Sequence, residues 1–162
     1  ILDMAKLESG RAEWVSGEVD IGQVARETMD SLGQLFLDKG VALDCDIPAC
    51  GPVVLADHDR LTQVLINLLS NAVKFVPGGE GHVHVRVGIV DGMVRVEVSD
   101  NGPGISASDR SKPKSFGLRG LHERAKSVGG WLDISAISGQ GTSIIFSAPL
   151  TAQADPAQED TP

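Results

Sequence analysis

Four groups of residues have types and spacings that can do chemistry. The first group shares one face of a predicted helix, because its members are spaced 4, 4 and 3 residues apart: Gln63, Asn67, Asn71 and Lys74. Two neutral amides and an ammonium on one line can ligate a hydrated divalent cation and hold phosphate oxygens, but they supply no strong base. A solvated helix face that binds no ligand explains the same four residues about equally well.

The second group directly follows a predicted strand. Asp100 is followed by Asn101-Gly102-Pro103-Gly104-Ile105, whose glycines let the backbone approach a flat ligand closely. A carboxylate at this point would accept a hydrogen bond from an amino group and would therefore prefer adenine to guanine. An Asx turn with glycines for tight geometry is the alternative, and this pattern by itself favours the turn.

Two further groups are rich in glycine. Phe116-Gly117-Leu118-Arg119-Gly120-Leu121 opens a predicted helix, whose first backbone N–H groups and dipole favour a bound phosphate. The surrounding stretch is the most basic of the chain and contains Arg110, Lys112, Lys114 and Arg119. Gly139-Gln140-Gly141-Thr142 precedes a predicted strand, and its Thr142 hydroxyl can support a ligand through a water molecule. A flexible solvated loop and a hairpin turn are the respective alternatives.

The elements that must position these groups follow from the hydrophobic periodicity. Helical spacing of apolar residues predicts a helix from Ile21 that stops at Asp38-Lys39-Gly40, a second that Asp57 or Asp59 caps, and a third over about 118–128. Alternating or short apolar runs predict strands over 41–47, 53–55, 82–90, 93–98, 131–137 and 142–147. Asp91-Gly92 joins two of them in a hairpin of type I′. This order predicts an α+β fold with helices on one face of a sheet.

Composition and charge limit the classes of function. The chain has 162 residues, enough for one domain with a real core, and its formal net charge is −8. Such an acidic balance argues against a generic nucleic-acid or anionic-membrane binder. No apolar run has the length of a membrane helix, and the start does not read as a signal peptide. Cys45 and Cys50 are expected to be reduced thiols, which fits a cytoplasmic setting.

In combination and in this order, the four groups resemble the sequence boxes of histidine-kinase ATP-binding domains. Asn67-Leu68-Leu69-Ser70-Asn71-Ala72-Val73-Lys74-Phe75 is similar to the N box, and Asp100-Asn101-Gly102-Pro103-Gly104 to the G1 box. Gly117-Leu118-Arg119-Gly120-Leu121 is similar to the G2 box, and Gly141-Thr142 to the closing Gly-Thr. The resemblance covers roughly residues 1–150, because Ile1–Arg11 is also similar to the end of the second dimerisation helix.

The resemblance implies a domain order and a fold. Residues 1–14 would be the tail of the second dimerisation and phosphoacceptor helix, 15–20 a linker and 21–150 the ATP-binding catalytic domain. Residues 151–162 read as a disordered acidic tail. The implied fold is the two-layer α/β sandwich of the Bergerat type. It has a mixed, mostly antiparallel sheet covered on one face by helices, and gyrase, chaperone and mismatch-repair ATPases share it.

The resemblance also implies ATP and Mg²⁺ as cofactors. Asn71 would ligate Mg²⁺, with Asn67 and Lys74 near the phosphates. Asp100 would accept a hydrogen bond from the adenine amino group, and Thr142 would support it. The remaining ATP-binding residues would shape the pocket or flank the triphosphate under a mobile lid: Gly102, Gly104, Ile105, Gly117, Leu118, Arg119 and Gly120. The lid, Ser106–Phe116, is only eleven residues long, so its basic contact to phosphate stays open among Arg110, Lys112, Lys114 and Arg119.

One position distinguishes a kinase from a hydrolase. Hydrolases of this superfamily carry a Glu four residues before the Mg²⁺-binding Asn, as the general base for water. Here Asn67 stands at that position and accepts no proton. The resemblance therefore implies transfer of the γ-phosphoryl to a separate nucleophile by positioning and charge neutralisation. In the family this nucleophile is a histidine upstream of Ile1; none of the four histidines here lies in a matching motif: His58, His82, His84 and His122.

The implied function is that of the catalytic domain of a two-component sensor histidine kinase. Its partners would be the upstream dimerisation and histidine domain and the receiver domain of a response regulator, with no nucleic acid. The parent protein would be a homodimer, the domain would be cytoplasmic, and this chain alone would not autophosphorylate. The alternatives are a degenerate nucleotide-binding module that only regulates, and an ATP hydrolase.

Overall fold

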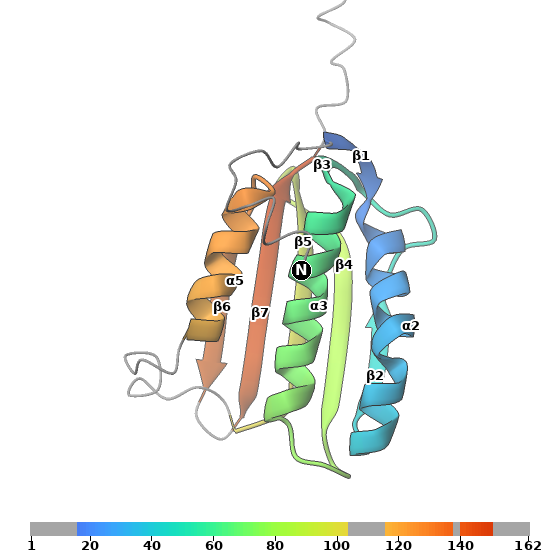
Figure 1. The fold of residues 1–162 in the computed structure, drawn as a ribbon, viewed down its shortest axis with the longest axis vertical. Helices are drawn as coiled ribbons and strands as arrows, with labels where there is room; N and C mark the ends of the chain where they lie inside the picture. Colours follow the sequence, from blue (N-terminus) through green and yellow to red (C-terminus); the bar gives the residue numbers. More distant parts are fainter. Residues whose placement is uncertain (1–15, 104–115, 138–139, 151–162) are drawn as a thin grey trace, which may run out of the picture.

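The computed structural model describes residues 16–103, 116–137 and 140–150, and within these ranges the chain forms two layers (Figure 1). One layer is a five-stranded sheet with the order β2 (Ala42–Asp46), β4 (His82–Val90), β5 (Met93–Asp100), β7 (Gly141–Pro149) and β6 (Trp131–Ile137). β2 and β4 pair in parallel, and the other three pairings are antiparallel. The mixed, mostly antiparallel sheet that we expected is confirmed.

The second layer consists of helices on one face of the sheet (Figure 1): α2 (Ile21–Lys39), α3 (His58–Phe75) and α5 (Phe116–Ser127). Asp20 caps α2 by accepting a hydrogen bond from the backbone N–H of Gln23 at 3.0 Å. Gly40 ends α2 with a φ of 71°, a left-handed conformation that glycine adopts without a steric penalty. Of the two candidate caps for α3, Asp57 fills the role. In the described ranges no helix is long and apolar enough to cross a membrane.

The core lies between the two layers and is almost entirely aliphatic. Alternating valines of β4 and β5 face the helices, among them Val85 and Val96, and both are buried. From the helix side, Leu61, Leu65 and Leu68 of α3 fill the same layer. Each such side chain contributes roughly 1.5–3 kcal/mol when it leaves water, so α3 is fixed firmly on the sheet.

One segment corrects our prediction. We predicted a linker over 15–20, but Ser16–Asp20 form strand β1, which pairs antiparallel with β3 (Val53–Asp57) in a separate two-stranded sheet. The reason is that Val19 is buried opposite Val54, which gives the short strand an apolar anchor. Our predictions for residues 1–14 and 151–162 lie outside the described residues.

The sheet face away from the helices carries an ionic cluster. Asp44 of β2 lies between two imidazoles of β4: its Oδ1 is 2.5 Å from His84 Nδ1, and its Oδ2 is 3.1 Å from His82 Nε2. The hydrogen bond with His84, together with His82, holds the pKa of Asp44 below its ordinary value. Cys45, the next residue on β2, is a free and exposed thiol, as is Cys50.

We predict that Asp44→Asn lowers the Tm near neutral pH. A carboxylate with a lowered pKa contributes stability above its ordinary pKa, and this contribution is lost as the pH falls through the lowered value. The Tm difference from the wild type should therefore disappear at the acid end of a pH series, measured by circular dichroism. Asp46→Asn is the control for the loss of one negative charge from β2. Asp46 pairs with an arginine of β4 rather than a histidine, with its Oδ2 3.9 Å from Arg86 Nε. A Tm difference for Asp44→Asn that persists at the acid end would contradict the assignment.

Candidate functional site

The polar face of α3 is present as predicted. The apolar residues of α3 are buried against the sheet, so the residues between them point away from it. Asn67 and Asn71 are partly exposed, whereas Gln63 and Lys74 are exposed. The two amides lie in the C-terminal half of the helix, within reach of a ligand but without full hydration.

Asp100 ends β5 directly beside β7, opposite Thr142 in the sheet register. Its Oδ1 accepts hydrogen bonds from the backbone N–H groups of Gly102, at 2.9 Å, and Thr142, at 3.3 Å. Burial raises the pKa of Asp100 above its ordinary value, although these two hydrogen bonds oppose the shift. Within the described residues both hydrogen bonds reach the same oxygen, so Oδ2 is the atom that a ligand's amino group can meet.

Gly141 permits this close approach of β5 and β7. Its φ is 106°, and a Cβ built on it would overlap the carbonyl oxygen of Asp100. Any other residue would push the start of β7 away and move the N–H of Thr142 out of reach of the Asp100 carboxylate. The Gly-Thr pair, for which a hairpin turn was the alternative interpretation, therefore allows β7 to approach Asp100 closely.

Asn101 connects the end of β5, which carries Asp100, to the loop that follows α3. It was assigned no role of its own in the sequence analysis. Its Nδ2 donates to the carbonyl of Glu80 at 3.1 Å, its Oδ1 accepts from the N–H of His82 at 2.7 Å, and its own N–H donates to the carbonyl of His82 at 3.2 Å. Glu80 belongs to the loop that leaves α3, so Asn101 holds that loop beside Asp100. Its position in an Asx-prone loop was the only signal in the sequence.

The glycine-rich segment opens α5. The helix begins at Phe116 rather than near Leu118, so Gly117, Leu118 and Arg119 lie in its first turn, followed by Gly120. Helices α3 and α5 pack against each other, with Leu121 buried. Gly102, the other predicted pocket glycine in the described ranges, is buried. The remaining predicted ligands lie outside the described residues: Gly104, Ile105, Arg110, Lys112 and Lys114.

A cavity elsewhere in the domain does not belong to this site. A cavity of about 280 Å³ is lined by β1, the start of α2 and His58, at the opposite end of α3 from Asn71. At 1.5 Å per residue the two ends are about 20 Å apart. In the part of the chain that the structure describes, no three His, Cys, Asp or Glu side chains form a group that could hold a metal ion.

We predict that Gly141→Ala destabilises the domain more than Gly92→Ala. Gly92 also has a positive φ, 75°, but a Cβ on it would meet open space. Gly92→Ala should therefore cost only the backbone strain, about 1–2 kcal/mol. Gly141→Ala adds the overlap with the Asp100 carbonyl, and denaturant unfolding should show a clearly larger loss of the free energy of unfolding. Equal losses for the two variants would contradict the steric role of Gly141.

We further predict that the stability of the ligand-free Asp100→Asn variant, relative to the wild type, increases as the pH rises. Because burial raises the pKa of Asp100, ionisation costs stability from the ordinary pKa upward, and the full cost is present above the raised value. An asparagine keeps the Oδ1 acceptor for Gly102 and Thr142 without the charge. Its Tm relative to the wild type should rise from acid to neutral pH. Asp91→Asn, in the β4–β5 turn, controls for the loss of one negative charge; an Asp100→Asn variant that loses relative Tm toward neutral pH would refute the prediction.

Comparisons with known proteins agree with this geometry. Residues 56–152 match the family "Histidine kinase-, DNA gyrase B-, and HSP90-like ATPase". The histidine protein kinase DivJ of Caulobacter vibrioides is 31% identical over 100% of this chain and 30% of its own length. The adaptive-response sensory kinase SasA of Prochlorococcus marinus (strain MIT 9313) is 37% identical over 58% of this chain and 25% of its own length. The chain thus spans less than a third of either relative.

Solved structures show the same fold. Full-length ShkA in complex with AMPPNP superposes with a TM-score of 0.76 and 28% identity, covering 93% of this chain and 34% of that one. The catalytic domain of histidine kinase ThkA superposes with a TM-score of 0.74 over 84% of this chain and 97% of that domain, at 24% identity. The chain therefore belongs to the family of histidine kinase-, DNA gyrase B- and HSP90-like ATPases, and its fold is that of a histidine-kinase catalytic domain.

Proposed function

We propose that this domain binds Mg²⁺-ATP and transfers the γ-phosphoryl to a histidine on a separate dimerisation domain. The observation that carries the proposal is the convergence of two elements. The Asp100 carboxylate at the end of β5 and the amide-bearing face of α3 are joined through Asn101 and the loop that leaves α3. The names of the relatives, which are sensory or histidine kinases, support the same reaction.

The adenine base would bind at Asp100. Its Oδ1 already accepts the N–H groups of Gly102 and Thr142, which orients the carboxylate and leaves Oδ2 for the adenine amino group. Guanine presents a carbonyl oxygen at the corresponding position, and two acceptors repel each other. The pocket should therefore select adenine, and the AMPPNP in the ShkA complex is an adenine nucleotide that supports this choice.

The phosphates and the metal would lie along α3 and at the start of α5. Mg²⁺ prefers oxygen ligands and keeps several waters, so the partly exposed amide of Asn71 fits it better than a closed cage would. When bound, Mg²⁺ would neutralise charge on the phosphates. Asn67 and Lys74 would hold phosphate oxygens, and the first backbone N–H groups of α5, from Gly117 to Gly120, would add partial positive charge. Gly104, Ile105 and Arg119 complete the proposed set.

Transfer to a separate nucleophile fits the chemistry of Asn67. An amide cannot take a proton from water, so Asn67 supplies no general base for hydrolysis. The acceptor histidine, the homodimer that carries it and the receiver domain of a response regulator are proposed as the partners of this domain. We propose a cytoplasmic location for the domain, where ATP is available.

The test is a calorimetric titration of the 162-residue chain with Mg²⁺-ATP and with Mg²⁺-GTP. We expect ATP to bind and GTP not to bind. Asp100→Asn replaces the Oδ2 acceptor by a donor, and a hydrogen bond to a charged group contributes about 1.5–3 kcal/mol, so ATP affinity should fall at least about tenfold. Asp91→Asn, which removes a carboxylate from the β4–β5 turn, should leave the affinity unchanged.

Two outcomes would replace the proposal. A folded chain that binds no ATP would indicate a degenerate module that only regulates. Steady release of phosphate, lost in Asn71→Ala, would indicate an ATP hydrolase. With ATP binding established, adding the upstream histidine domain should yield labelled phosphohistidine from γ-labelled ATP, and the absence of label would refute the kinase reaction.

A further inference from the structure

Lys39, the last residue of α2, makes two hydrogen bonds to the last turn of another helix. Its Nζ donates to the carbonyl of Val73 at 2.5 Å and to the carbonyl of Lys74 at 2.9 Å. The last four carbonyls of a helix have no partner within the helix, and that end carries partial negative charge. The ammonium therefore satisfies two carbonyls of α3 and offsets the negative end of its dipole.

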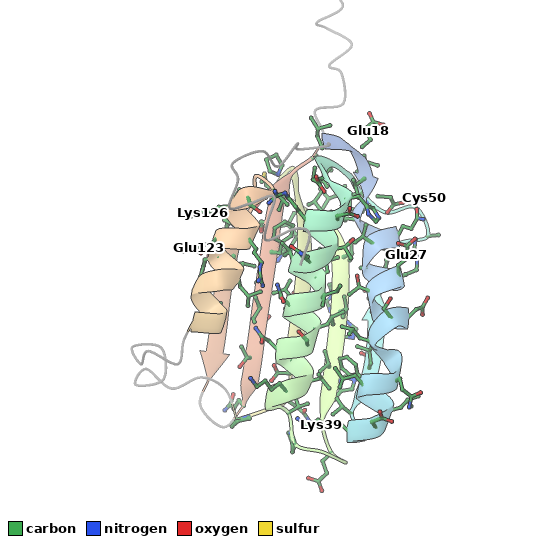
Figure 2. The ribbon with its side chains drawn as sticks, viewed as in Figure 1. Glu18, Glu27, Lys39, Cys50, Glu123 and Lys126 are labelled. Carbon is green, nitrogen blue, oxygen red and sulfur yellow. The ribbon has the colours of Figure 1, made fainter. Side chains whose placement is uncertain are left out.

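The backbone around Lys39 reinforces this junction. The N–H of Gly79, in the loop that leaves α3, donates to the carbonyl of Lys39 at 3.2 Å, and the N–H of Ala42 donates to the carbonyl of Gly81 at 2.9 Å. Figure 2 places Lys39 at the end of α2, beside the C-terminal end of α3. The end of α2 and the exit from α3 are thus joined from both sides, and Lys39 adds the side-chain link.

We propose that Lys39 is a positioning residue for the phosphate side of the nucleotide site. This inference rests on the proposed function, in which Asn71 meets Mg²⁺ and Lys74 meets phosphate. Both lie in the part of α3 that Lys39 holds, and Lys39 contacts the backbone of Lys74 itself. Without it, two carbonyls of the last turn lose this donor, and the negative end of the helix dipole loses the cation that offsets it, close to where the phosphates would lie.

This role differs from general stabilisation of the fold. The adenine side of the site depends on Asp100, whose hydrogen bonds come from Gly102 and Thr142 and do not involve α2. Loss of Lys39 should therefore affect binding of the phosphates and leave binding of the adenosine part in place. A cation at the C-terminal end of a helix contributes at most about 2 kcal/mol, so the expected loss of phosphate affinity is on the order of tenfold.

The test compares Mg²⁺-ATP with adenosine, each titrated calorimetrically into the full chain. Lys39→Met keeps the aliphatic stem and removes the donor and the charge. We expect its affinity for Mg²⁺-ATP to fall about tenfold, its affinity for adenosine to stay the same, and the ratio of the two to fall accordingly. Lys39→Arg, which can still donate to two carbonyls, should recover much of the ratio.

Arg26→Met is the matched control. Arg26 also lies on α2, and its Nη1 donates to a backbone carbonyl, that of Pro48, at 2.9 Å, but far from the end of α3. Its ATP-to-adenosine ratio should equal that of the wild type. Should Lys39→Met not fold, Lys39→Gln replaces it; because it removes the charge but keeps a neutral donor, a smaller fall in the same direction is expected.

The outcomes separate the two proposals. Unchanged ATP binding in a folded Lys39→Met, or equal losses for ATP and adenosine, would overturn the positioning role while leaving the proposed function intact. A wild-type chain that binds ATP no more tightly than adenosine would refute the phosphate site itself, and the role of Lys39 would fail with it. A selective fall in the ratio that Arg26→Met does not show would establish the role.

Discussion

The pairing of β5 with β7 at Asp100 and Thr142 is the constraint on which the site depends. It brings a carboxylate to the edge of the core, where burial raises the pKa of Asp100 and makes its ionised form costly. Two backbone N–H groups offset part of this cost, and a ligand's amino group would offset more. In the proposed function, the charge on Asp100 would cost stability in the ligand-free domain and favour binding in the complex, an exchange of stability for function.

The second constraint is that helix α3 belongs both to the core and to the candidate site. One face of the helix fills the core, and the other presents Asn67 and Asn71, so the core packing that fixes the helix also fixes the amides. Packing alone leaves the last turn free to fray, since its carbonyls lack partners. Asn101 from one side and Lys39 from the other hold this end in relation to Asp100. The candidate site therefore lies where α2 and the end of β5 meet the C-terminal end of α3 and the loop that follows it.

Local signals explain which parts of the fold could be predicted from the sequence. The β4–β5 hairpin follows from strict alternation around Asp91-Gly92, and both turn residues have the positive φ that a type I′ turn requires. Strand β1 was missed because Val19 is the only large apolar side chain in its five residues, too few to show a period. The contacts of Lys39 and Asn101 were missed for another reason. Their partners are backbone carbonyls and an N–H group 19 to 35 residues away. Every residue type has a backbone carbonyl, so the sequence does not indicate which position provides the partner.

The overall charge explains why such local contacts matter for a phosphate ligand. A chain with a formal net charge of −8 repels a triphosphate at long range, and this repulsion is screened beyond about 8–10 Å at physiological salt. In the proposed function, favourable binding would come from groups within that distance, among them the first N–H groups of α5, the ammonium of Lys74 and a bound cation. The C-terminal end of α3 would add negative partial charge at the same place. Because the Lys39 ammonium lies on the last carbonyls of α3, it would offset that charge and allow this end of the helix to face a polyanion.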